Sequence, residues 1–187
     1  APGPFNPLLP SAPQVQQAAT DSSADSDLMR VFFHDATFVV HFRSYYLGRD
    51  VPNGAADLGA LAAGGWLGYQ TGWIGDTVRF GIVGYGSFPV WAPKDRDGTL
   101  LLGVGQESYA VIGQAYVAVK LWEQILTGYR QMVNEPEVNP QDNRMTPNTF
   151  EAIALKGSFA GPVLRQKFDY EVGYLSQVKL RDADSFI

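Results

Sequence analysis

Apolar and polar side chains alternate with a period of two along most of the chain after residue 29, a pattern that indicates β-strands and not helices. The clearest stretch is residues 31–48, where Phe38 and Val40 fall on one face and His41 and Arg43 on the other. Because successive side chains of a strand point to opposite faces of a sheet, this stretch predicts a strand with one apolar and one mixed polar face.

A second long strand is predicted near the end of the chain, at residues 165–181. A helix there would place Lys167 and Glu171 on the same side as Tyr170 and Tyr174, whereas a strand separates the charged from the aromatic positions. Further period-two stretches lie between the two long ones, at residues 58–71, 77–86, 109–120, 124–132 and 150–157. The facing of the last two of these stays open.

Two of these stretches carry explicit predictions of which side chains share the apolar face. In residues 109–120, parity groups Val111 with Val117. In the last strand, parity groups Val178 with Phe168. Both groupings assume that the alternation is unbroken along the strand.

The connections between the predicted strands alternate in length. Long polar connections cover residues 49–57, 88–106 and 133–148, and short ones cover residues 72–76, 121–123 and 158–163. Strict alternation of this kind is typical of transmembrane barrels, which have short periplasmic turns and long external loops. Trp73, Trp122 and Phe159 all fall at the short turns, as expected of an aromatic girdle at a membrane interface, although core aromatics that flank turns give the same pattern.

Strand length and strand number favour a membrane barrel over a soluble one. The two long strands exceed the ~5–6 residues usual in soluble sheets and reach the ~9–11 residues that cross a bilayer. The count is about seven, whereas bacterial membrane barrels close with an even number. We therefore expect an all-β, antiparallel transmembrane β-barrel of which this chain, ending at Ile187, provides only a part.

Residues 1–28 differ from the rest of the chain. They are rich in Pro, Ala, Ser and Gln and contain few large apolar side chains, so we predict a flexible N-terminal extension. Residues 29–187 then form the partial barrel domain. The chain begins with Ala1, which indicates either a removed signal peptide or a trimmed sequence.

Composition excludes several classes of protein. The chain has a net charge of −5, which argues against nucleic-acid binding, and no Cys, which removes disulfides and thiol chemistry. No apolar run approaches the ~20 residues of a membrane-spanning helix, so a membrane location requires a closed barrel. His34 and His41 have opposite parity and cannot share a metal, and no nucleophile elbow or phosphate-binding loop is present. We expect no enzyme activity and no cofactor.

Two stretches resemble the OprD-like family of outer-membrane porins. The segment FHDATFVVHFRSYYLGRD (residues 33–50) resembles the family's opening strand, which runs through an Asp to an Arg, two aromatics and Arg-Asp. The segment DNRMTPNTFE (residues 142–151) resembles the end of the family's third loop, and residues 67–81 are a looser match. The resemblance covers residues 30–187 in order, less than half of a family member, whose barrel has about eighteen strands. The loop at residues 88–106 matches no family pattern.

The resemblance implies a passive channel for amino acids, small carboxylates or related solutes in the bacterial outer membrane, in contact with its lipids or lipopolysaccharide. It implies a monomer or homotrimer and a ladder of basic lumen residues, which carries over to Arg43 and Arg144. We expect residues 133–148 to fold inward as a constriction with charges on opposed walls. The candidate pore-lining residues are Arg43, Arg79, Arg130, Arg144, Glu135, Glu137, Asp142, Lys167, Asp169, Glu171 and Lys179.

Other interpretations of the same residues remain open. The third loop is also compatible with a solvated external loop, and the charged wall residues with simple pairing inside the barrel. For the whole protein, the alternatives are a non-conducting structural or adhesion barrel and a soluble ligand-binding barrel. A soluble barrel would dissolve without detergent, and a structural barrel would not conduct.

Overall fold

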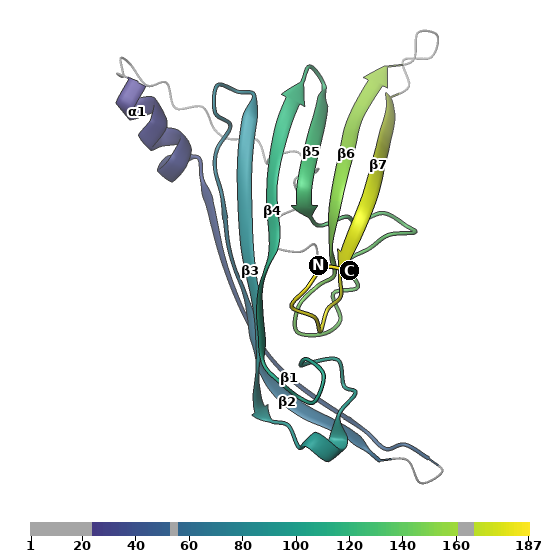
Figure 1. The fold of residues 1–187 in the computed structure, drawn as a ribbon. Helices are drawn as coiled ribbons and strands as arrows, with labels where there is room; N and C mark the ends of the chain where they lie inside the picture. Colours follow the sequence, from purple (N-terminus) through teal and green to yellow (C-terminus); the bar gives the residue numbers. More distant parts are fainter. Residues whose placement is uncertain (1–23, 53–55, 161–166) are drawn as a thin grey trace.

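A computed structural model describes residues 24–52, 56–160 and 167–187 as one antiparallel sheet of seven strands. Neighbours in the sheet follow chain order from β1 to β7. Figure 1 shows them side by side in a curled half-barrel, with α1 and the β4–β5 turn at one end and the loop after β3 at the other. The strands are β1 (Thr37–Arg49), β2 (Leu58–Gln70), β3 (Val78–Trp91), β4 (Tyr109–Leu121), β5 (Gln124–Gln131), β6 (Thr149–Ala160) and β7 (Lys167–Lys179).

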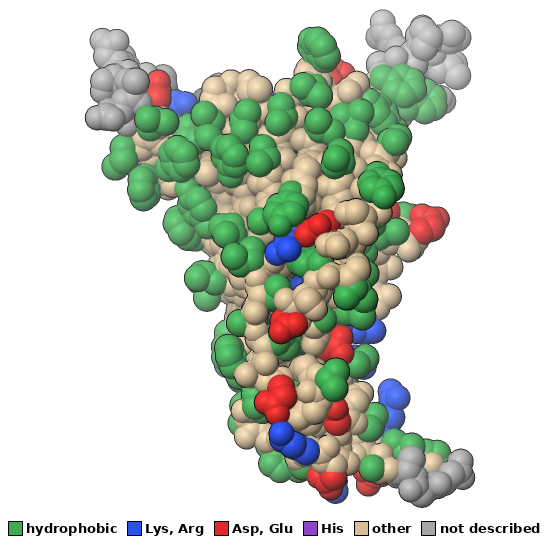
Figure 2. Space-filling view, viewed as in Figure 1, with side chains coloured by type: hydrophobic (Ala, Val, Ile, Leu, Met, Phe, Trp, Pro, Cys, Tyr) green, Lys and Arg blue, Asp and Glu red, His purple; other side chains and the backbone are tan. Residues whose placement is uncertain are grey.

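One face of the sheet is apolar and exposed. The register pairs Phe38 with Tyr69 and Tyr69 with Ile82, so these side chains form one row across three strands. Val40 and Leu67 form the neighbouring row on the same face and are 78% and 61% exposed. In Figure 2, apolar side chains crowd the half of the molecule nearer α1, and charged ones gather toward the long loops. We call this surface the outward face, because exposed apolar side chains at this density are what a barrel presents to lipid.

The opposite face, which we call the inward face, carries the packed side chains. Its main cluster comprises the buried residues Trp66, Val83, Tyr85, Tyr116 and Ala118. The sheet therefore has the polarity expected from the alternation in residues 31–48 and 58–71.

Two bulges change the facing that parity predicted. The β3–β4 register shifts between Val83 and Gly84, which brings Val111 opposite Tyr85 on the inward face, against the sequence expectation. A side chain at Gly113 would place its Cβ 2.0 Å from the Tyr85 ring, so the bulge requires glycine there. A bulge inserts one residue and so reverses the facing beyond it.

The second bulge lies in the β6–β7 pair. The register shifts between Glu151 and Ala152, and Val178 consequently packs with Phe150 on the inward face. Parity had predicted that Val178 would lie with the outward side chains. The pairing also settles the facing of β5 and β6, which the sequence left open: Thr127 and Gln131 are buried, whereas Ile153 is exposed.

The first strand begins later than predicted, because residues 24–34 are helical. An α-helix, α1 (Ala24–Met29), continues into a π-helical turn, η1 (Arg30–His34). Residues 24–28, assigned above to the flexible extension, therefore have regular structure; residues 1–23 lie outside the described residues. The backbone oxygen of Val31 accepts a hydrogen bond of 2.8 Å from the Gly72 N–H, which fixes the helix to the β2–β3 turn.

The connections follow the predicted alternation in length only in part. Residues 122–123 are short and residues 92–108 and 132–148 are long, but the connection at residues 50–57, predicted to be long, is hardly longer than the one at residues 71–77; residues 161–166 lie outside the described part of the chain. Trp122 at the β4–β5 turn is 95% exposed, and Phe159 stacks on Phe168 with ring centroids 5.1 Å apart. In the described ranges, no helix has the length and hydropathy needed to cross a membrane.

Candidate channel constriction

The loop between β5 and β6, residues 132–148, lies across the inward face of the sheet. Its Val138 packs against the buried cluster of Val133, Phe150 and Ala152, against which Val178 of β7 also packs. Its Met145 is buried with Leu101 and with Ala60 of β2, four strands away from β6. We call this segment the constriction loop, because its packing spans much of the concave surface.

Arg43 of β1 binds the constriction loop through Asp142. The guanidinium donates from Nη1 to Oδ1 at 2.7 Å and from Nη2 to Oδ2 at 3.2 Å. Nη1 also donates to the backbone oxygen of Arg144, and the guanidinium carbon lies 4.8 Å from the centre of the Trp66 ring. The Arg43 and Asp142 side chains are only 22% and 13% exposed, so solvent screens this bidentate pair less than a surface pair.

Arg144 ties the constriction loop to the loop between β3 and β4. Its Nε donates to the backbone oxygen of Thr99 at 3.1 Å, and its Nη1 donates to the backbone oxygen of Asn143 at 2.9 Å. Both acceptors are neutral, so the positive charge of Arg144 is not cancelled by these contacts.

Lys179 anchors the end of the constriction loop. Its side chain is fully buried, and Nζ donates to Thr146 Oγ1 at 3.3 Å, to the Pro147 oxygen at 3.4 Å and to the Leu180 oxygen at 2.7 Å. Nζ also lies 5.5 Å from the centre of the Tyr85 ring. An ammonium group needs such polar and aromatic neighbours to be tolerated in a buried position.

A further charged group, Lys156, joins the constriction loop to β6 and β7. Lys156 Nζ lies 3.1 Å from Glu171 Oε2 and 3.5 Å from Glu135 Oε1. A hydrogen bond shared with Glu171 and the charge of Lys156 lower the pKa of Glu135, against the opposing effect of burial. Glu135 is therefore ionised at neutral pH.

The other predicted residues are not part of these contacts. Arg79 is buried near the β2–β3 turn, with its guanidinium carbon 4.2 Å from the centre of the Trp73 ring. Lys167 and Asp169 form an exposed pair at 3.0 Å at the start of β7. Glu137 is exposed in the constriction loop.

Arg130 lies on the other face of the sheet. The register runs from Ile82 through Ala115 to Arg130 and then to Glu151, which continues the outward row. Arg130 Nε donates to Glu151 Oε1 at 2.9 Å. Arg130 is one residue from the long-loop end of β5, where a charge on the lipid side costs only ~0–1 kcal/mol. The prediction that Arg130 lines the pore is therefore wrong, because the register places Arg130 on the outward face.

Several residues of the site escaped the sequence analysis. Lys156 was missed because the facing of its strand was ambiguous, and Met145 and Thr146 because apolar and hydroxyl side chains in a loop carry no signal of their own. Trp66 and Tyr85 belong to the site because the fold brings them under Arg43 and Lys179. The described residues contain no group of three or more His, Asp or Glu side chains that could hold a metal ion.

Solved structures share this fold. The chain is similar to OccK9 (OpdG) of Pseudomonas aeruginosa, with a TM-score of 0.71 and 22% identity over 84% of this chain and 42% of that one. It is similar to OccAB1 of Acinetobacter baumannii, with a TM-score of 0.70 and 22% identity over 84% of this chain and 38% of that one. A BenF-like porin from Pseudomonas fluorescens gives a TM-score of 0.69 and 20% identity, covering 83% of this chain and 40% of the other.

Sequence comparison leads to the same family. Porin D of Pseudomonas aeruginosa is 26% identical over 181 residues, which cover 92% of this chain and 39% of that protein. The chain thus spans about two fifths of the length of the relative it matches. The family model for the outer membrane porin, OprD family, matches residues 30–185. Since that match covers nearly the whole chain, the chain belongs to the OprD family of bacterial outer-membrane porins.

Proposed function

We propose that this chain contributes the first strands and the constriction loop of a passive channel for small polar solutes, namely amino acids or small carboxylates. The observation that carries the proposal is the position of residues 132–148 across the inward face, held there by Asp142 on Arg43. A loop that merely covered the outside of a barrel would have no reason to bind a wall residue of β1.

The preference for carboxylate solutes rests on charge placement. Asp142 neutralises Arg43, whereas Arg144 donates to the backbone oxygens of Thr99 and Asn143, so the positive charge of Arg144 remains available to an anionic solute. Charged rings on the wall of a pore select ions by sign. Passive diffusion needs no cofactor, and the protein would act as a monomer or homotrimer among outer-membrane lipids or lipopolysaccharide.

The test is planar-bilayer conductance of the protein purified from its membrane, with a salt gradient to measure selectivity. We expect discrete open steps that small carboxylates or amino acids alter. Arg144→Ala should shift the reversal potential toward cation selectivity, whereas Arg144→Lys, which keeps the charge, should shift it much less. A folded protein that never conducts would instead support a structural or adhesion barrel.

A further inference from the structure

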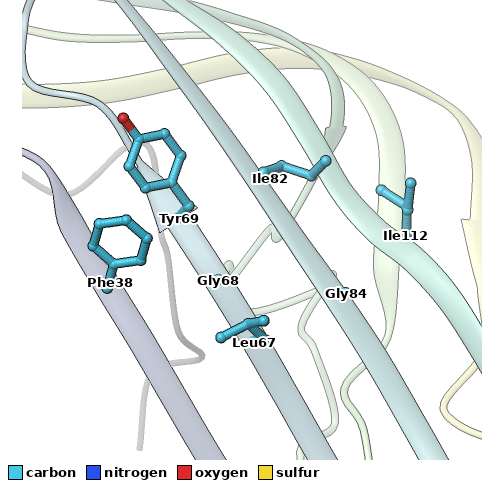
Figure 3. Close-up of a pocket in the computed structure, with 7 residues that line it drawn as sticks. All are labelled: Phe38, Leu67, Gly68, Tyr69, Ile82, Gly84 and Ile112. Atoms are coloured by element: carbon cyan, nitrogen blue, oxygen red, sulfur yellow. The ribbon is translucent and has the colours of Figure 1, made fainter. Parts of the chain in front are cut away.

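The outward face contains an apolar groove that the transport of solutes does not use. It has a volume of about 300 Å³ and crosses strands β1 to β4. Figure 3 shows large side chains projecting around a stretch of bare backbone at two glycines. The lining residues are Phe38, Leu67, Gly68, Tyr69, Ile82, Gly84 and Ile112.

The groove exists because Gly84 has no side chain. A Cβ built at Gly84 meets nothing closer than the Leu67 backbone oxygen at 4.0 Å, and Gly84 has no positive φ that would require glycine. Neither the backbone nor packing therefore demands glycine here. The neighbours in its row, Leu67 and Ile112, are large and exposed, so Gly84 leaves a gap between two large apolar side chains.

The chemistry of the lining admits only an apolar occupant. Tyr69 carries the one polar side-chain atom among the lining residues, and its hydroxyl donates to the Phe32 backbone oxygen at 2.8 Å. Water in the groove would find no free partner there, and an empty groove would forfeit the dispersion contacts of its walls. In a bilayer, the mobile apolar material that fills such a space is an acyl chain.

The position of the groove indicates which leaflet supplies that chain. Phe38 is the second residue of β1, and Tyr69 is the last but one of β2, so the groove opens near the short-turn end of the strands. Short turns of bacterial barrels face the periplasm. The adjoining helix exposes Leu28, Met29 and Phe33, which extends the apolar surface to the membrane boundary on that side.

We infer that the groove at Gly84 holds one acyl chain of a phospholipid from the periplasmic leaflet. Because the chain belongs to a family of outer-membrane porins, its exposed apolar outward face is the surface that contacts lipid, and the groove is continuous with that face. The occupant is therefore a membrane lipid and not a solute. The inference is independent of conduction, because the groove and the constriction loop lie on opposite faces of the sheet.

The test uses the purified protein in phospholipid vesicles containing a phospholipid with a photoactivatable group near the end of one acyl chain. Mass spectrometry then locates the labelled residues. We expect Leu67 and Ile82 to be labelled several-fold more than Ile153, which is equally apolar and exposed on the same face. Gly84→Leu should abolish that excess, and Gly84→Ala should reduce it less.

Gly128→Leu is the matched control. Gly128 pairs with Val117 and Ile153 on the outward face, and a Cβ there meets nothing within 4 Å. This variant should fold and conduct like the wild type and keep the excess labelling at the groove. Equal labelling at the groove and at Ile153, or labelling that Gly84→Leu leaves unchanged, would overturn the inference. A Gly84-dependent self-association of the protein in the same vesicles would overturn it in favour of a second copy as the occupant.

Discussion

Replacing Asp142 by Asn should loosen the constriction loop and at the same time change the ion selectivity of the proposed channel. The substitution keeps the size of the side chain but removes the charge that holds the Arg43 guanidinium in a bidentate pair. A fully exposed pair contributes about 0–1 kcal/mol, and breaking a fully buried one costs about 3–5 kcal/mol. With 22% and 13% exposure, the pair lies between these limits, and we expect a loss of about 2 kcal/mol.

A loss of that size sets the expected change in loop position. About 2 kcal/mol corresponds to roughly 30-fold in an equilibrium constant, so the segment around Asp142 should leave the wall about 30 times more often. Arg144 and Thr146 still hold the rest of the loop to Thr99 and Tyr109. Single-channel records should therefore show more frequent fluctuations between conductance levels and not one permanently wider pore. The reversal potential should shift toward anions, because a negative charge is lost.

Glu107→Gln is the matched control for Asp142→Asn. It removes the same charge from an exposed pair with Lys94 in the loop between β3 and β4. A double-mutant cycle of Arg43→Met and Asp142→Asn, measured by denaturant unfolding, should give a coupling of about 2 kcal/mol. A coupling below about 0.5 kcal/mol, or equal current fluctuations in Glu107→Gln and Asp142→Asn, would refute the assignment of the pair as an anchor of the loop.

Two further predictions concern packing and pH. Gly113→Ala should destabilise the folded protein by about 1–3 kcal/mol in denaturant unfolding, because its Cβ would lie 2.0 Å from the Tyr85 ring; Gly128→Ala, in open space, should change stability little, and equal midpoints for the two would contradict this reasoning. The pKa of Glu135 is lowered in the folded protein, first by its hydrogen bond with Glu171. The stabilising contribution of Glu135 is therefore present above the ordinary Glu pKa of about 4.3, and it is lost as the pH falls through the lowered pKa of the folded state. Selectivity should therefore move toward anions below that pH, and Glu135→Gln should remove this step.

The positions of most strands and the outward face were predictable from the sequence because lipid imposes a simple requirement on them. Most outward positions along β1, such as Phe38 and Val40, are apolar, and a period of two records that preference directly. Differences in the length of the connections were visible because a tight turn leaves only a few residues between two period-two stretches. The family resemblance then led to the prediction that residues 133–148 fold inward.

The bulges could not be predicted, because their cause lies in another strand. Gly113 is one glycine among twenty, and only its approach to Tyr85 shows why the bulge has a glycine there. The facing of Arg130 likewise depends on pairing with Ala115 and Glu151, which no local pattern records. The helix at residues 24–34 was missed because its start lies in a polar segment and its end resembles a strand.

The inward face is harder to predict than the outward one because polar side chains there are selected for their partners and not for their polarity. Arg43, Lys156 and Lys179 all sit under or beside the constriction loop, yet one binds a carboxylate, one bridges two carboxylates and one is buried among neutral acceptors. Burying a charge is costly unless it is paired or hydrogen-bonded, so each of these residues commits the loop to a particular position. Three different anchors hold the loop against the inward face more firmly than any one of them, because a loop that detaches must leave all three charged groups without these partners. In the proposed channel, selectivity would then depend on the charges that the anchors leave unneutralised. Arg144, with neutral backbone partners, is therefore expected to matter more to the permeating solute than the better-paired Arg43.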